Sequence, residues 1–279
     1  EHDPFVDRFV LIQGDRTFTG TPKPLHFPNE DTRFDRFKHK IIIKNVELKK
    51  DPASPWENEL TQRNISFSCI NYLSEDVVYL SDVDEIISRN HWPSLLQRIP
   101  TEKQPIAVWL DMFNFYINYR LIEAKWMQPK LFLGKHFLTG TKTANDFRVD
   151  YTLPTTASPC GWHFSYLMTE EQIREKLNSF SHQEFNRPLF NNPKKIKDQL
   201  RKRRDLFKRG LLFEPTAVTE SWPLDMIGNP FWKKYICSTE PPVNSLSDII
   251  EDHLFWTVEF IRNQKNEIKK WVKRLLLTN

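Results

Sequence analysis

An apolar run that leads directly into an acidic turn most limits what this chain can fold into. Residues 77–80 (Val-Val-Tyr-Leu) have the β-branched and aromatic character of a buried strand. The residues that follow are Ser81, Asp82, Val83, Asp84 and Glu85. The pattern predicts a strand that delivers a pair of aspartates on a turn.

Two earlier apolar runs place this strand in an α/β arrangement. Residues 9–12 (Phe-Val-Leu-Ile) and 41–43 (Ile-Ile-Ile) predict strands. Pro55 opens a predicted helix that has Trp56, Leu60, Ile65 and Cys69 near helical spacing and ends before Ser74. Strand, helix and strand in this order favour a parallel sheet, in which ligands bind at the carboxyl edge of the strands. The acidic turn is therefore expected in a binding crevice.

The second half of the chain predicts strands and helices in alternation. Residues 106–110 and 113–119 are rich in apolar and aromatic residues typical of strands. Thr169 is a plausible N-cap for a helix that ends near Phe180. A basic helix is expected over residues 191–210, with Ile196, Leu200 and Phe207 on its apolar face and Gly210 at its end.

Composition favours one catalytic domain with a helical tail. The chain has 279 residues, of which 39% are hydrophobic, and we predict a domain over 1–237, a linker over 238–245 and amphipathic helices over 246–279. The three cysteines lack the spacing of a zinc site and are expected as free thiols. No run of about 18 apolar residues is present, which favours a soluble chain.

The net charge of +4 hides two basic clusters, in residues 194–209 and 265–274. Nucleic acid is disfavoured as a partner because no aromatic platform accompanies the charge. The basic, amphipathic C-terminal helix allows peripheral membrane contact. Packing against the domain or a partner is the alternative for the same helix.

The acidic turn suggests a metal-dependent reaction of a nucleotide. Two carboxylates that flank one residue, here Asp82 and Asp84, can hold a divalent cation that binds a pyrophosphate. The alternative is a solvated turn, since short acidic triplets are common. The position directly after an apolar strand favours the functional interpretation.

Several runs, in this order, resemble one family of enzymes. They are Phe9-Val10-Leu11-Ile12, Thr17-Phe18-Thr19-Gly20, Lys23-Pro24-Leu25, Trp56-Glu57, Gln62-Arg63-Asn64, Ser81-Asp82-Val83-Asp84-Glu85-Ile86 and Gly161-Trp162-His163-Phe164-Ser165-Tyr166. Together they resemble glycosyltransferase family 17, the family of the β-1,4-mannosyl-glycoprotein 4-β-N-acetylglucosaminyltransferase. The segments around Glu184 and Asp205 look more like microbial or viral members.

This resemblance implies a GT-A-like, Rossmann-like nucleotide-binding fold with C-terminal helices. It also implies an inverting transfer of N-acetylglucosamine from a UDP-sugar to a glycan or related hydroxyl acceptor, with Mn²⁺ or Mg²⁺ at Asp82 and Asp84. The positions that it assigns to donor binding are Gln13, Thr17, Lys23, Gln62, Arg63, Asp82 and Trp162. Similar sequences usually have Glu where this chain has Gln13, and a further strand and helix before residue 9.

Two residues of the aromatic motif have competing interpretations. His163 is a candidate third metal ligand, since a neutral imidazole readily takes that role. The alternative is a partly buried histidine in the core. Trp162 is either a platform for the sugar face or a core residue.

The inverting reaction needs a carboxylate that takes the proton of the acceptor hydroxyl. Glu184 is the first candidate because it lies in a polar stretch after the helix that Thr169 opens. Asp205 and Glu171 are the runners-up. All three are also typical of solvated or helix-capping positions.

Two other function classes compete with this hypothesis. A sugar nucleotidyltransferase also uses acidic metal sites, but it needs a glycine-rich phosphate loop, and the chain has only seven glycines. A catalytically inactive carbohydrate-binding relative is the second alternative. A microbial or viral member would be cytoplasmic, and an animal-type member would lie in the Golgi lumen.

Overall fold

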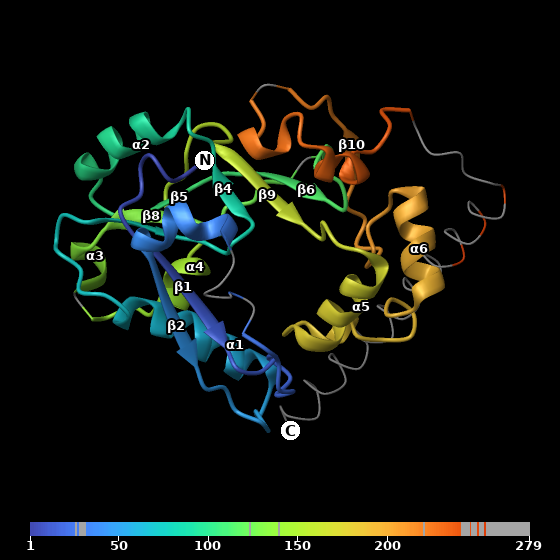
Figure 1. Ribbon diagram of the computed structural model, residues 1–279, viewed down its shortest axis with the longest axis horizontal. Coiled ribbons are helices and arrows are strands. Elements are labelled where there is room, and N and C mark those ends of the chain that lie inside the picture. Colours follow the sequence, from blue (N-terminus) through green and yellow to red (C-terminus); the bar gives the residue numbers. More distant parts are fainter. Residues whose placement is uncertain are drawn as a thin grey trace, which may run out of the picture. The chain divides into compact units, whose positions relative to one another are not determined.

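A computed structural model of the chain is shown in Figure 1. It describes residues 1–25, 27, 32–122, 124–138, 140–219 and 221–240, and the single residues 246, 250 and 254. The chain divides into two compact units, Glu1–Glu240 and Pro241–Asn279. The predicted C-terminal amphipathic segment lies almost wholly outside the described residues. None of the described helices has the length and apolar content to cross a membrane.

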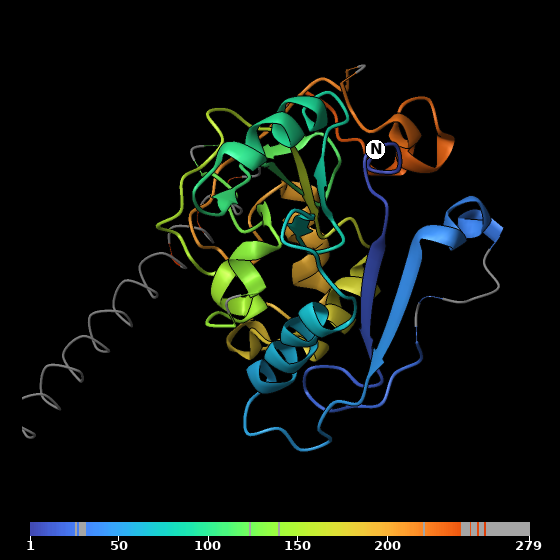
Figure 2. The ribbon, with the colours of Figure 1, turned by 90° about the vertical axis from the view of Figure 1, so that its left-hand side faces the viewer.

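The first layer of the larger unit is a pair of parallel strands with a helix beside it. Strands β1 (Phe9–Gly14) and β2 (Ile41–Val46) pair with Phe9 opposite Ile41, and the 3₁₀ helix η1 (Thr32–Lys40) leads into β2. Figure 2 shows the two strands side by side. Helix α1 (Pro55–Asn64) begins at Pro55 as predicted and continues into η2 (Ile65–Ser68).

The strand before the acidic turn does not join this parallel pair. Strand β3 (Val77–Leu80) pairs antiparallel with β8 (Lys130–Leu133), which also pairs with β5 (Ile106–Ala107). The expectation of one parallel sheet through all three N-terminal strands was therefore wrong. The Gly134 N–H bonds Asp76 O at 2.7 Å and extends the β3–β8 ladder. The two strands are about fifty residues apart in the sequence, so local sequence patterns cannot identify β8 as the partner of β3.

A third sheet has the order β10-β7-β6-β9-β4, and only β6 and β9 are parallel. Its strands are β4 (Glu85–Ile87), β6 (Asp111–Asn114), β7 (Tyr119–Leu121), β9 (Gly161–Ser165) and β10 (Phe213–Pro215). The predicted strand over 113–119 was wrong in its middle, because a turn separates β6 from β7. Phe115 has a φ of 66° there, which no strand adopts.

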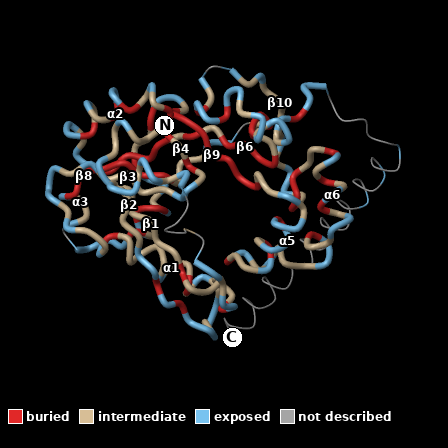
Figure 3. Tube along the Cα trace, viewed as in Figure 1, coloured by how far each residue is buried: buried red, intermediate tan, exposed pale blue. Residues whose placement is uncertain are grey.

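The core lies between these sheets and short helices. Helix α2 (Trp92–Arg98), followed by η3 (Ile99–Thr101), packs Trp92, Leu95 and Ile99 against Ile106 and Leu131 of the β3-β8-β5 sheet. The helices α3 (Lys135–Leu138) and α4 (Ala144–Arg148) follow β8. Figure 3 shows buried residues concentrated along β6 and β9.

The C-terminal part of this unit is helical. Helix α5 (Glu170–Ser179) has the predicted cap, since the Thr169 hydroxyl accepts the Gln172 N–H in a capping box. After η4 (Gln183–Phe185), helix α6 (Pro193–Lys202) ends at Arg203, which has a left-handed φ of 50°. The prediction of a helix as far as Gly210 was therefore wrong. The 3₁₀ helices η5 (Leu224–Met226) and η6 (Pro230–Tyr235) complete the unit, and all three cysteines are free.

Candidate active site

A cleft of about 2320 Å³ lies at one edge of the sheets. Its lining comes from β1, α1, the turn after β3, the ends of β6 and β9, α5 and the segment around η4. In Figure 1 the β1–α1 side and the α5 side face each other, with β9 between them. Both aspartates of the acidic turn line this cleft.

The acidic turn is a closed four-residue loop between β3 and β4. The Glu85 N–H donates to Asp82 O at 3.2 Å, and the Asp82 N–H donates to Glu85 Oε2 at 2.7 Å. Val83 between the aspartates is 91% exposed, so it contributes nothing to the core. The turn therefore projects Asp82 and Asp84 while Glu85 points inward.

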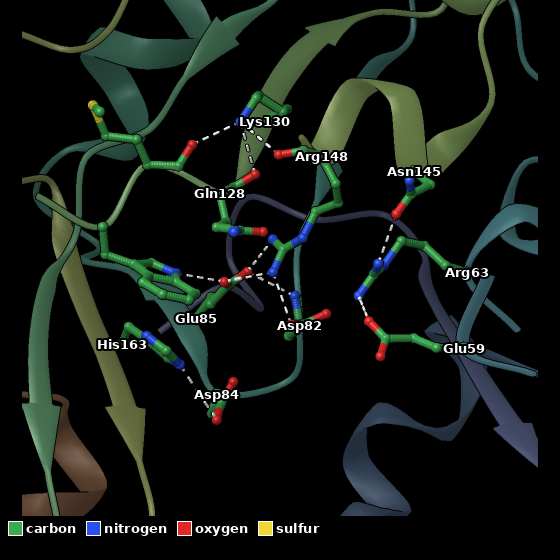
Figure 4. A network of polar contacts seen from close by, with 12 residues as sticks. Glu59, Arg63, Asp82, Asp84, Glu85, Gln128, Lys130, Asn145, Arg148 and His163 are labelled. Atoms are coloured by element: carbon green, nitrogen blue, oxygen red, sulfur yellow. Dashed lines mark hydrogen bonds and ion pairs between the residues drawn. The ribbon is translucent and has the colours of Figure 1, made fainter. Parts of the chain in front are cut away.

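Glu85 is buried and accepts hydrogen bonds from four donors, one of which is the Asp82 N–H. Arg148 Nη1 and Nη2 lie 2.5 and 2.7 Å from its two oxygens, and Trp126 Nε1 donates at 2.6 Å. Arg148 Nη2 also lies 2.8 Å from Asp82 Oδ2 (Figure 4). Burial acts to lower the pKa of Arg148, but Glu85 and Asp82 outweigh it and raise that pKa. The guanidinium thus joins α4 to the turn as a permanent cation.

A buried lysine supports Arg148 from the opposite side. Lys130 Nζ donates to the backbone oxygens of Met127, Gln128 and Arg148, at 2.6, 3.0 and 3.2 Å (Figure 4). Burial and the nearby Arg148 lower the pKa of Lys130 to about 8. Lys130 on β8 thereby joins the last residue of α4 to the segment that leads into β8.

Asp84 lies in a different environment from Asp82. His163 Nε2 is 3.6 Å from Asp84 Oδ2, and the imidazole packs on Trp126 with ring centroids 4.2 Å apart. Burial acts to raise the pKa of Asp84, but His163 and Lys176 outweigh it, so that pKa lies below its usual value. Asp84 is consequently a carboxylate at neutral pH, as metal binding requires.

The donor set of the turn fits a hard divalent cation. Among the residues that the structure describes, no three His, Cys, Asp or Glu side chains come together as a complete metal site. Mg²⁺-type sites need only one or two carboxylates when substrate phosphates and waters supply the other ligands. Asp82 and Asp84 meet that requirement, and their side chains are 52% and 33% exposed.

Comparison with known protein families shows which family this chain belongs to. The model of glycosyltransferase family 17 matches residues 1–217. The chain belongs to glycosyltransferase family 17. No curated protein and no solved structure matches the chain. Membership in family 17 means an enzyme that transfers sugars.

The family-17 aromatic motif lies on β9, where side chains alternate between two faces. His163 and Ser165 line the cleft, together with Met112 and Asn114 of the neighbouring β6. Trp162 is 6% exposed and belongs to the core cluster on the other face. This burial favours the interpretation of Trp162 as a core residue over that of a platform for the sugar face.

The residues assigned to donor binding by resemblance to family 17 divide into two groups. Gln13, Gln62 and Arg63 line the cleft, whereas Thr17 and Lys23 are not among its lining residues. Arg63 is held by Glu59 at 2.6 Å and by Asn145 at 2.8 Å (Figure 4). Gln13 is also engaged, since its Oε1 accepts the Phe27 N–H at 3.0 Å and its Nε2 donates to Asn45 Oδ1 at 3.1 Å.

The three candidate bases lie in different environments. Glu184 lines the cleft, its side chain is 57% exposed, and its Oε1 is 2.7 Å from His182 Nδ1. Burial acts to raise the pKa of Glu184, but the His182 hydrogen bond outweighs it and lowers that pKa. Asp205 is 4% exposed and accepts hydrogen bonds from Arg209, which disfavours it as a base. Glu171 lies in the first turn of α5.

Arg148, Glu85 and Lys176 were missed as site residues at the level of sequence. Glu85 belongs to the motif run, but nothing local marks it as buried. Arg148 lies 63 positions later in the chain. Their pairing follows from the fold, and only the placement of α4 reveals it.

Proposed function

We propose that this family-17 chain has a GT-A-like fold and transfers a sugar from a UDP-sugar donor to a hydroxyl of a glycan or related acceptor. N-acetylglucosamine is the favoured sugar and Mn²⁺ the favoured cation, both on the family resemblance. The observation that supports this most is the presentation of Asp82 and Asp84 into the cleft by a buried Glu85–Arg148 pair. Such a buried pair fixes the turn before any ligand binds.

Each side chain has a distinct part in the proposed reaction. Asp82 and Asp84 would hold the cation, and a cation bound there would supply positive charge to offset that of the departing diphosphate. Glu184 takes the proton of the acceptor hydroxyl, and His182 orients it through the 2.7 Å contact. The acceptor oxygen forms its bond to the anomeric carbon as the bond to the β-phosphate oxygen breaks. The electron pair leaves with UDP, and the configuration inverts.

The test is UDP release from a panel of UDP-sugars, with Mn²⁺ or with EDTA. Asp82→Asn and Asp84→Asn should each lower kcat/KM by at least about 100-fold, since the cation loses a charged ligand. Asp51→Asn is the matched control, because Asp51 is exposed and lies outside the cleft lining. Full turnover in EDTA, or in both variants, would overturn the proposal. Donor binding without UDP release would instead indicate the inactive relative.

A further inference from the structure

The parallel strands β6 and β9 end at the cleft in the same way. Asn114 is the last residue of β6 and Ser165 the last of β9, and the two are register partners. Each is followed by an aromatic residue with a left-handed backbone, Phe115 with a φ of 66° and Tyr166 with a φ of 56°. Adjacent strands therefore present a pair of polar side chains at one edge.

The left-handed turns are unusual for bulky residues. Aromatic side chains at positive φ are disfavoured and persist only where the surroundings hold them, which is often at ligand sites. Here the Phe115 N–H donates to Ser165 O at 3.1 Å, and both rings pack in the cluster with Ile173 and Leu177 of α5. The turns direct the Phe115 ring into the core, whereas Tyr166 packs in the same cluster and also lines the cleft beside Asn114 and Ser165.

Asn114 has a buried acceptor without a partner. It is 2% exposed, and its Oδ1 has no hydrogen bond within the described part of the chain. The comparably buried Asn58 and Asn118 are satisfied, since Lys49 N–H and Cys237 N–H donate to their Oδ1 atoms at 2.9 Å. Asn191 Oδ1 and Gln199 Oε1 are also buried without a partner in the described residues, but neither residue lines the cleft. A buried acceptor that lacks a partner and lies at a cleft is suited to bind a ligand. Asn114 and Ser165 both line the cleft.

A lysine from α5 joins the same edge. Lys176 lines the cleft, and its Nζ lies 4.3 Å from the centre of the Tyr166 ring. Burial lowers the pKa of Lys176, and the charges of Asp84 and Asp82 act to raise it. The ammonium thus lies in the field of the acidic turn, at the edge where β9 ends.

The spacing along β9 matches a sugar next to a diphosphate. His163 contacts Asp84, and Ser165 lies two residues farther on the same face, about 6.6 Å along the strand. The sugar of a UDP-sugar is bonded directly to the β-phosphate, so the sugar ring must bind immediately next to the cation site that holds this phosphate. Sugar hydroxyls both donate and accept, which fits an amide, a hydroxyl and an ammonium.

We propose that Asn114, Ser165 and Lys176 form the subsite that binds the hydroxyl groups of the transferred sugar ring. This inference rests on the proposed function, because it places the ring beside a diphosphate held at Asp82 and Asp84. The Asn114 carbonyl accepts from a ring hydroxyl, and Lys176 donates to another. A diphosphate would leave the Asn114 acceptor unpaired, since it has no proton to give at neutral pH.

The test compares UDP with UDP-N-acetylglucosamine by calorimetry in the presence of Mn²⁺, on the full chain. Asn114→Ala and Ser165→Ala should each weaken UDP-N-acetylglucosamine binding about 10-fold while UDP binding stays within about twofold. Ser88→Ala is the matched control, a buried serine outside the cleft lining. Thermal unfolding checks that each variant folds. If Asn114→Ala does not fold, the binding data of Ser165→Ala alone test the subsite.

Two results would overturn the subsite. One is equal weakening of UDP and UDP-N-acetylglucosamine, and the other is wild-type affinity for both in Asn114→Ala and Ser165→Ala. A wild-type chain that binds neither ligand with Mn²⁺ would instead reject the proposed function itself, and the subsite with it. The wild-type titration therefore separates the two failures.

Discussion

The guanidinium of Arg148 binds the carboxylate of Glu85 through two contacts, Nη1 with Oε2 at 2.5 Å and Nη2 with Oε1 at 2.7 Å, and each side chain is at most 2% exposed. This pair lies directly beneath the aspartates of the turn. Because Arg148 also contacts Asp82, its buried guanidinium orients two carboxylates, the buried one of Glu85 and the exposed one of Asp82. The rigidity of the turn therefore depends on a residue from α4.

Removal of Arg148 should destabilise the fold strongly. Arg148→Met leaves Glu85 buried without its countercharge, and breaking such a pair is expected to reduce the free energy of unfolding by about 3–5 kcal/mol. Urea denaturation followed by tryptophan fluorescence measures the change.

Arg120→Met is the control for that experiment. The Arg120–Glu214 pair bridges β7 and β10, but its side chains are 39% and 42% exposed. An exposed pair contributes about 0–1 kcal/mol. Similar losses in the Arg148 and Arg120 variants would show that the Glu85 pair is no stronger than a surface pair.

The lowered pKa of Lys130 predicts that the free energy of unfolding rises at alkaline pH. Its pKa is about 8 in the folded chain, below the ordinary value of 10.5, so the folded state binds fewer protons between these two values. The contribution of Lys130 to the free energy of unfolding should therefore grow as pH rises from 8 toward 10, and should be lost as pH falls through 8. Urea denaturation of wild type and Lys130→Met at pH 7.5 and 9.5 measures it. A wild-type advantage that does not grow over this interval would contradict the assignment.

Trp162 should matter for stability and not for donor binding. Trp162→Ala removes a buried ring from the core on the far face of β9, with an expected loss of about 3–5 kcal/mol in the free energy of unfolding. The milder Trp162→Phe should keep the KM for the UDP-sugar within about twofold of wild type. A large rise in this KM with an unchanged free energy of unfolding would show instead that Trp162 takes part in donor binding.

Some of this site could be predicted from the sequence and some could not. The strand over 77–80, the acidic turn and the Thr169 capping box are local patterns, and the structure has all three. The period of two along β9 separates Trp162 from His163, so a strand assignment there would have placed these two side chains on opposite faces of the sheet. The Arg148–Glu85 pair and the antiparallel partner of β3 join distant segments, which no local pattern encodes.

In the proposed function, Asp82 and Asp84 bind a cation together with the diphosphate of UDP. Electron paramagnetic resonance of free Mn²⁺, titrated with the chain, measures this directly. One Mn²⁺ should bind per chain when UDP is present, more weakly without UDP, and at least about tenfold more weakly in Asp84→Asn. Mn²⁺ binding that is the same in wild type and Asp84→Asn, or UDP binding that is unaffected by EDTA, would contradict the account.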